Sequence, residues 1–236
     1  MLHEIKTELG FDLIELGHGI RVSLMPGIQK VFDAGEVRFS SLHNFCPLPI
    51  EVMMASPDCY QFSAVSSEER ERAVKQTLQT IDFAVRLNAP FVVLHLGQVN
   101  MPPITDRLIN MAKTGAYLSR KYVRLKIEAV QKREKIAPAY LQRVKDCLGR
   151  IIEYAASKNV RLALEGRRGY EEIPTERELP ALLDELNSGQ IGYWHDFGHS
   201  QIKENLGFID HAVAIEEDGA LCGNRGHETL VSIFSE

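Results

Sequence analysis

The sequence predicts an α/β fold in which helices alternate with the strands of a parallel sheet. Short apolar segments of strand length recur along the chain, and amphipathic segments of helical length lie between most of them. Strands that alternate with helices form parallel sheets with right-handed crossovers. We therefore expect a single α/β domain over residues 1–236, with a helical insertion at about 100–136 and an atypical tail at about 218–236.

Five segments have the length, apolar composition and flanking turn residues of buried strands. They are 11–16 (FDLIEL), 37–46 (VRFSSLHNFC), 91–96 (FVVLHL), 160–165 (VRLALE) and 191–196 (IGYWHD). Because side chains alternate along a strand, the last segment places Trp194 and Asp196 on one face and His195 on the other. We expect a turn at Gly198 to bring His199 beside Asp196.

Helices are predicted before and between these strands, over 3–9, 25–35, 139–157 and 206–217 and from two capping sites. Ser66 with Glu69, and Thr175 with Glu178, have the spacing of a capping box that opens a helix. Residues 100–135 are less regular and rich in Lys and Arg. A solvated helix face explains this charge better than a phosphate-attracting flap over a site.

Composition narrows the class of protein. The chain has 236 residues, 44% hydrophobic content and a formal net charge of -5, which gives no overall attraction to nucleic acid or anionic lipid. It has no apolar run of the roughly 20 residues that a membrane span requires. Its four cysteines show no CxxC spacing. We expect a cytoplasmic protein that does not enter a membrane, and the charge disfavours nucleic acid as a partner.

Each predicted strand carries an ionisable residue at or near its last position. These residues are Glu15, His43, His95, Glu165 and Asp196. The carboxyl ends of parallel strands lie at the same edge of a sheet, where ligands bind. Buried carboxylates are costly unless they are paired, hydrogen-bonded or bound to a cation. The pattern therefore predicts one shared site, whereas His3, His18, His195 and His227 are interpreted as structural.

The segments LHNFCP, VVLHLG, LALEGR and YWHDFGHS, in this order, resemble the xylose-isomerase-like TIM-barrel superfamily. That superfamily contains sugar and sugar-phosphate isomerases and epimerases and the endonuclease IV type of DNA repair enzyme. The resemblance implies a (β/α)8 barrel. It also implies a metal ligand and proton-transfer residue at Glu165, a metal ligand at Asp196, and a metal or substrate contact at His199.

The other strand-end residues are expected to contact the substrate. By the same resemblance, His43 and His95 line the pocket or, as in the endonucleases, bind zinc, and we assign Glu15 to the same role. Arg167, just beyond Glu165, has the chemistry to hold a phosphate or carboxylate of a sugar. Carboxylate and imidazole ligands are compatible with Mn, Mg, Co or Zn, so the sequence predicts a divalent cation without choosing among these metals.

The resemblance is incomplete at both ends. Strands two to six of the barrel are recognisable, whereas strands one, seven and eight are missing or degenerate, because the chain starts in a helix and residues 218–236 show no convincing strand. An open parallel edge favours pairing with another chain, so we expect a homo-oligomer. Three functions stay open: sugar isomerisation or epimerisation, phosphodiester cleavage on DNA, and a non-catalytic family member.

Overall fold

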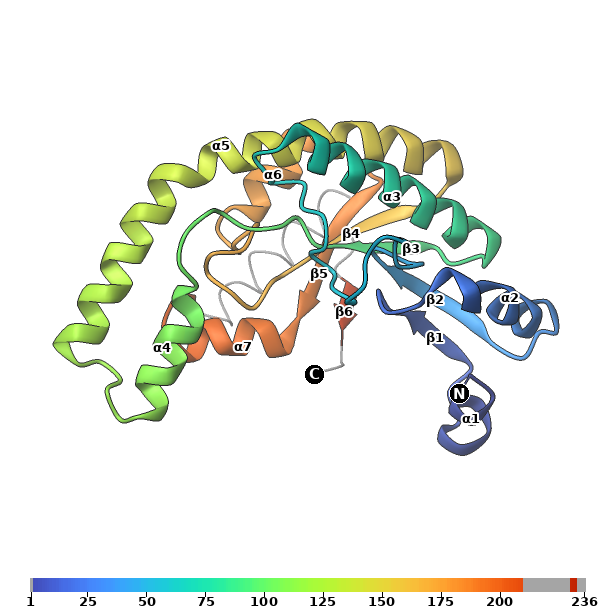
Figure 1. Ribbon diagram of the computed structural model, residues 1–236, viewed down its shortest axis with the longest axis horizontal. Coiled ribbons are helices and arrows are strands. Elements are labelled where there is room, and N and C mark those ends of the chain that lie inside the picture. Colours follow the sequence, from blue (N-terminus) through green and yellow to red (C-terminus); the bar gives the residue numbers. More distant parts are fainter. Residues whose placement is uncertain (1, 210–229, 233–236) are drawn as a thin grey trace.

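The computed structural model describes residues 2–209 and 230–232 of the chain (Figure 1). Its helices and strands alternate in the predicted order over most of this length. They are α1 (Leu2–Leu9), β1 (Leu13–Leu16), α2 (Met25–Asp33), β2 (Arg38–His43), α3 (Ser67–Arg86), β3 (Phe91–Leu94), α4 (Ile104–Lys113), α5 (Arg120–Lys158), β4 (Arg161–Glu165), α6 (Leu179–Leu186), β5 (Ile191–Asp196), α7 (Phe197–Asn205) and β6 (Leu230–Ser232).

The strands form one parallel sheet in the order β1-β2-β3-β4-β5-β6. Each strand therefore pairs with its neighbours in sequence, as in a barrel wall, and β1 and β6 are the two edges among the described strands. The predicted α/β fold with an incomplete barrel is confirmed. The short strand β6 was not predicted, because its three residues lie in a Gly-rich tail without a strand-length apolar run.

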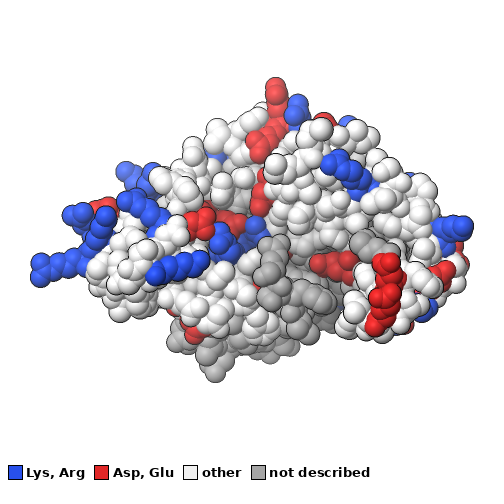
Figure 2. Space-filling view, turned by 60° about the horizontal axis from the view of Figure 1, so that its bottom comes forward, with Lys and Arg blue, Asp and Glu red and all other residues white. Residues whose placement is uncertain are grey.

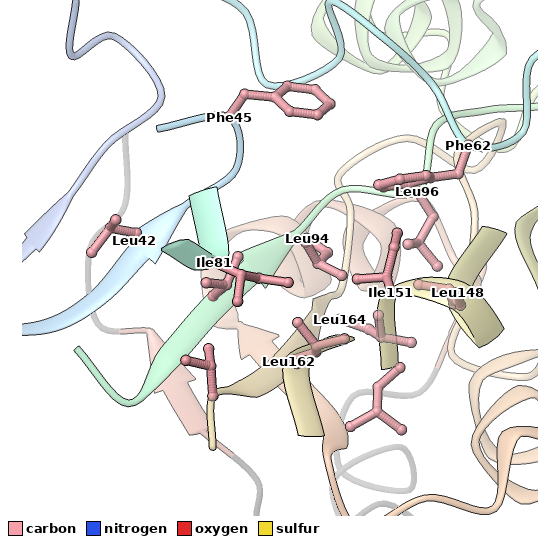
Figure 3. Packing of buried hydrophobic residues seen from close by; sticks show 14 of the residues in the cluster. Leu42, Phe45, Phe62, Ile81, Leu94, Leu96, Leu148, Ile151, Leu162 and Leu164 are labelled. Carbon is pink, nitrogen blue, oxygen red and sulfur yellow. The ribbon is translucent and has the colours of Figure 1, made fainter. Parts of the chain in front are cut away.

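The hydrophobic core lies between the outer face of the sheet and the helices that cover it (Figure 3). Alternate residues of the strands, such as Leu94 and Leu164, pack there against Ile81 of α3 and Leu148 and Ile151 of α5, and all five side chains are fully buried. Since side chains alternate along each strand, the intervening residues face the inner side of the sheet. That inner side carries the strand-end residues.

Helix α5 is a single helix of 39 residues that continues through Pro138. The sequence predicted a helix only from residue 139, after a less regular segment, and the structure corrects this expectation, since the helix continues although proline removes one helix hydrogen bond. The first half of α5, with α4, forms a helical arm (residues 104–138). The arm packs through Leu108 and Tyr122 against Leu206 and Phe208, which follow α7. Figure 2 shows Lys and Arg side chains at the free end of this arm, as expected for a solvated helix face.

Two helix starts differ from the prediction. Helix α6 begins at Leu179, four residues after Thr175, because residues 176–178 form a turn; Glu178 still accepts a hydrogen bond from the backbone N–H of Thr175, as in a capping box. Helix α7 begins directly after Asp196, whereas a helix was predicted only from residue 206. The remainder of that predicted helix, from residue 210, lies outside the described residues, as does His227.

The predicted cap of α3 is confirmed, because the Ser66 hydroxyl accepts a hydrogen bond from the backbone N–H of Glu69. Replacing Ser66 by alanine should lower the free energy of unfolding by about 1 kcal/mol, since one N–H at the helix start loses its partner. Urea unfolding measures this change. The matched variant Ser67→Ala, one residue into the helix, should change it by less than about 0.5 kcal/mol; equal losses would contradict the capping role.

None of the helices among the described residues combines the length and the apolar character needed to cross a membrane.

Candidate active site

The strand ends meet at Glu165, the last residue of β4, which is only 5% exposed. Its Oε2 atom lies 2.8 Å from Nε2 of His43 and 2.7 Å from Nε2 of His95. Its Oε1 atom lies 3.2 Å from Nδ1 of His199. His43 ends β2, His95 directly follows β3, and His199 lies just beyond β5. Three histidines from three parts of the sheet therefore surround one carboxylate.

Asp196 places His199 by capping helix α7. Its Oδ1 accepts a hydrogen bond from the backbone N–H of His199 at 2.8 Å, and its Oδ2 lies 3.6 Å from Nδ1 of that histidine. The expected Gly198 turn is thus the first turn of a helix. Nδ1 of His199 also faces the carbonyl oxygen of Gly166 at 3.1 Å. Because both this oxygen and Glu165 Oε1 only accept, Nδ1 carries a proton and donates it.

Gly97 allows the chain to turn just beyond His95. It adopts a φ of +100°, and a Cβ atom at this position would lie 2.4 Å from Oγ of Ser63 and 2.8 Å from Cβ of Gln61. Only glycine fits such a conformation and such a contact without displacement of its neighbours. The turn is held by Ser63, whose hydroxyl donates to the carbonyl oxygen of Gln98 at 2.9 Å.

Two groups of side chains in this region have the composition of metal ligands, and they share Glu165. One contains His43, His95 and Glu165, and the other contains Glu165, Asp196 and His199. Within each group the ligand atoms lie within 4.8 Å of one another. The two oxygens of Glu165 divide between them, since Oε2 faces the first pair of histidines and Oε1 faces His199.

The first group fits a divalent cation in both spacing and chemistry. Nε2 of His43 and Nε2 of His95 lie 3.1 Å apart, and Glu165 Oε2 lies 2.8 and 2.7 Å from them. Atoms that bind one transition metal at about 2.0–2.2 Å are separated by about 3 Å. Two imidazoles and one carboxylate suit Zn, Mn or Co, whereas Mg and Ca prefer sites made of oxygen alone.

The charges of the cluster are strongly coupled. Burial alone would raise the pKa of Glu165, but hydrogen bonds from His199, His43 and His95 outweigh it and lower this pKa far below its usual range. Burial alone would lower the pKa values of His95 and His199, but the facing carboxylates outweigh it and raise both. Glu165 is therefore an anion at neutral pH, and its negative charge is held out of bulk water by three imidazoles.

Arg167 lies against the cluster rather than in free solvent. Its side chain is 12% exposed, and its Nη1 atom lies 3.0 Å from Nε2 of His95 and 3.8 Å from Oε1 of Glu165. Its Nη2 atom pairs with Asp58 at 3.0 Å and with Glu172 at 2.8 Å. The predicted arginine therefore reaches the shared site, but two carboxylates already hold it. The neighbouring Arg168 instead pairs with Asp106 at the surface.

Asp58 and Glu172 are contacts that the sequence did not predict. Asp58 lies in the loop between β2 and α3, and its Oδ2 is 3.5 Å from Nδ1 of His95. Glu172 lies in the loop after β4, five residues beyond Arg167. Neither residue is at a strand end, so strand alternation gives no signal for them. The only available signal was that both residues are carboxylates in loops, and the chain has several such residues, so this signal did not single out Asp58 or Glu172.

Glu15 and His18 lie at the β1 edge of the site. Glu15 accepts a hydrogen bond from the Ser41 hydroxyl at 2.5 Å and is in neither group of ligand residues. His18 was interpreted as structural, but its ring packs edge-on at 5.5 Å from the ring of His43, so it borders the site. His195 lies on the other face, as predicted, and its Nδ1 is 2.9 Å from the hydroxyl of Tyr193.

Comparison with known families agrees with the fold. The family described as xylose isomerase-like TIM barrel matches residues 6–221, which is most of the chain. No curated protein matches the sequence at a significant level.

Solved structures resemble the fold at low sequence identity. The 3-keto-D-glucoside 4-epimerase YcjR from E. coli, in its apo form, is 14% identical, with a TM-score of 0.63 over 98% of this chain and 72% of that protein. A protein from Rhodospirillum rubrum described as a putative xylose isomerase is 15% identical, with a TM-score of 0.63 over 98% of this chain and 70% of its own.

A third structure contains a sugar. It is the D-allulose 3-epimerase from Methylomonas sp. in complex with D-allulose, which is 15% identical, with a TM-score of 0.60 over 98% of this chain and 64% of that protein. At these identities the structures share the fold, and this chain spans about two thirds of their length. The family match and the parallel sheet agree, and the chain belongs to the xylose isomerase-like TIM barrel family.

Proposed function

We propose that this protein is a metal-dependent sugar or sugar-phosphate isomerase or epimerase. The observation that supports this proposal best is the single buried carboxylate, Glu165, shared by His43 and His95 on one side and by Asp196 and His199 on the other. The family, together with neighbours that are sugar epimerases, favours a sugar substrate. A buried carboxylate surrounded by imidazoles contributes little to stability, because the interactions with its partners must first offset the free-energy cost of its desolvation.

The reaction would move a proton at the carbon next to a carbonyl group. A divalent cation held by Glu165 with the two histidines, or with Asp196, would stabilise the negative charge that develops on the substrate oxygen. Glu165 is ionised at neutral pH, and its Oε1 would receive the proton from the substrate. His199 would orient that oxygen through its Nδ1–H group. Arg167 would bind the phosphate or hydroxyl groups of the substrate after exchanging one carboxylate partner.

Phosphodiester cleavage is the second candidate, because one specific observation favours it. The two oxygens of Glu165 face two neighbouring groups of candidate ligands, and paired cations are common in enzymes that hydrolyse phosphodiesters. The net charge of -5 opposes binding of a polyanion such as DNA. This function therefore ranks below isomerisation.

Two measurements separate these candidates. The purified protein, loaded with Mn, Co or Zn, is incubated with ketohexoses, aldohexoses and their phosphates in D2O, and NMR follows exchange of the hydrogen next to the carbonyl. We expect exchange that depends on the cation. Cleavage of duplex DNA with an abasic site is measured in parallel at low and high salt. DNA cleavage without sugar exchange would replace the proposal by the second candidate, and stoichiometric metal without either reaction would support a non-catalytic family member.

A further inference from the structure

The two ring nitrogens of His95, a candidate metal ligand, have different surroundings. Its side chain is 3% exposed, and its Nε2 atom faces Glu165 and His43. Its Nδ1 atom is buried and has no hydrogen-bond partner among the described residues. Asp58 faces it, with Oδ2 at 3.5 Å, which is slightly long for a hydrogen bond. The side of the ring turned away from Glu165 is therefore next to a second carboxylate.

Arg167 indicates which ring nitrogen has the lone pair. Its Nη1 atom lies 3.0 Å from Nε2 of His95, and a guanidinium group can only donate hydrogen bonds. This contact favours a neutral ring in which Nε2 accepts and the proton is on Nδ1, the atom that faces Asp58. The same oxygen of Asp58 also accepts from Nη2 of Arg167 at 3.0 Å. Asp58 thus contacts both the ring and the arginine that approaches its other side.

Glu165 has the opposite influence on the same ring. Its Oε2 atom lies 2.7 Å from Nε2 of His95 and would accept a proton from that nitrogen. In the neutral ring two carboxylates therefore compete for the single proton, Glu165 at Nε2 and Asp58 at Nδ1. A histidine binds a metal through the nitrogen without a proton, and a hydrogen bond at the other nitrogen selects this form. Asp58, at Nδ1, and Arg167, at Nε2, both favour the form whose lone pair is on Nε2, beside Glu165 and His43.

We propose that Asp58 is a positioning residue that keeps the proton of His95 on Nδ1, so that Nε2 offers its lone pair to a divalent cation shared with His43 and Glu165. The inference rests on the metal centre of the proposed function but not on any substrate. Glu172 provides the internal comparison. It also holds Arg167, at 2.8 Å, but none of the hydrogen bonds or ion pairs among the described residues joins it to His95.

Metal affinity tests the proposal directly. Zn and Mn dissociation constants are measured by competition with a chromogenic chelator for the full chain and for the variants Asp58→Ala, Asp58→Asn and Glu172→Ala. Loss of the carboxylate behind a metal-binding histidine weakens binding about 10–100-fold, and we expect this loss in Asp58→Ala. Asp58→Asn keeps an oxygen acceptor and should recover part of the affinity. Glu172→Ala should stay within about threefold of wild type, because the acceptor beside His95 is unchanged.

The proton position is measured without any metal. Long-range ¹H–¹⁵N spectra of the histidine rings, assigned with a His95→Gln variant, distinguish a proton on Nδ1 from one on Nε2. In the neutral ring we expect Nδ1–H in wild type and Nε2–H in Asp58→Ala, where Glu165 is the remaining acceptor.

Three results would overturn the inference. The first is a wild-type ring with its proton on Nε2, and the second is unchanged affinity in Asp58→Ala. The third is an equal loss in Glu172→Ala, which would show that Asp58 acts only by holding Arg167. A wild-type protein that binds no metal would remove the metal centre of the proposed function, and the NMR spectra would still decide which nitrogen Asp58 controls. Thermal denaturation of each variant confirms that it is folded.

Discussion

Replacing Glu165 by glutamine should abolish metal binding and any proton transfer, the largest functional effect expected in this chain. The carboxylate belongs to both groups of candidate ligands, so one substitution removes an anionic ligand from each. Loss of a residue that only supports a ligand costs about 10–100-fold in affinity, and loss of the ligand itself should cost more. Loss of a general base should slow proton exchange by a further 10²–10⁴-fold, approximately. Chelator competition and NMR exchange in D2O measure the two effects.

Glu171→Gln is the matched control for this prediction. Glu171 lies in the loop after β4 and is similarly buried, at 7% exposed, but its carboxylate accepts from Thr105 at the start of α4 instead of facing the histidines. We expect metal affinity within about threefold of wild type. If Glu165→Gln retains its metal with wild-type affinity while remaining folded, the cation is not held at the shared carboxylate and the proposed function loses its main support.

Replacing Lys203 by methionine should cause the largest loss of stability. Lys203 is 1% exposed and forms an ion pair with Glu176, whose side chain is 6% exposed. The second oxygen of Glu176, Oε2, is buried without a hydrogen-bond partner among the described residues. Removing the lysine would leave a buried carboxylate with no positive partner, and breaking such a pair typically costs about 3–5 kcal/mol. Urea unfolding monitored by circular dichroism measures the loss.

A double variant distinguishes a broken pair from a packing defect. Lys203→Met combined with Glu176→Leu removes both charges and should recover most of the lost stability, because buried pairs replaced by apolar residues are often neutral or stabilising. Lys145→Met provides a surface control, since the pair of Lys145 with Glu185 is partly exposed and should contribute at most about 1 kcal/mol. If the double variant is less stable than Lys203→Met, the ion pair itself is required, and removing the unpaired carboxylate is not enough to restore stability.

The sheet and the centre of the site were predictable because strand alternation acts over a few residues. LALE and YWHD each read as a buried strand with a carboxylate in the last inward position, and parallel strands place those positions at one edge. The same logic places His43 and His95 beside Glu165 without any alignment. The convergence of these four residues is a consequence of the sheet topology, so the sequence was sufficient to predict it.

Contacts made by loops were not predictable in this way. Asp58 reaches His95 from a loop of more than twenty residues between β2 and α3, and Glu172 reaches Arg167 from the loop after β4. Loop conformation depends on distant packing rather than on periodicity. The continuity of α5 through Pro138 has a similar origin, because packing on both sides of the residue outweighs the local preference of proline.

Glu165 presents one oxygen to each of its two groups of neighbours, and this division makes them interdependent. A divalent cation bound by His43, His95 and Glu165 would draw electron density from the whole carboxylate, so the opposite oxygen would be a weaker donor for a second cation. Two cations should consequently bind in two unequal steps, the first tight and the second weak, rather than independently and with the same affinity. The affinity of the second position for its ligand would then depend on whether a cation occupies the first.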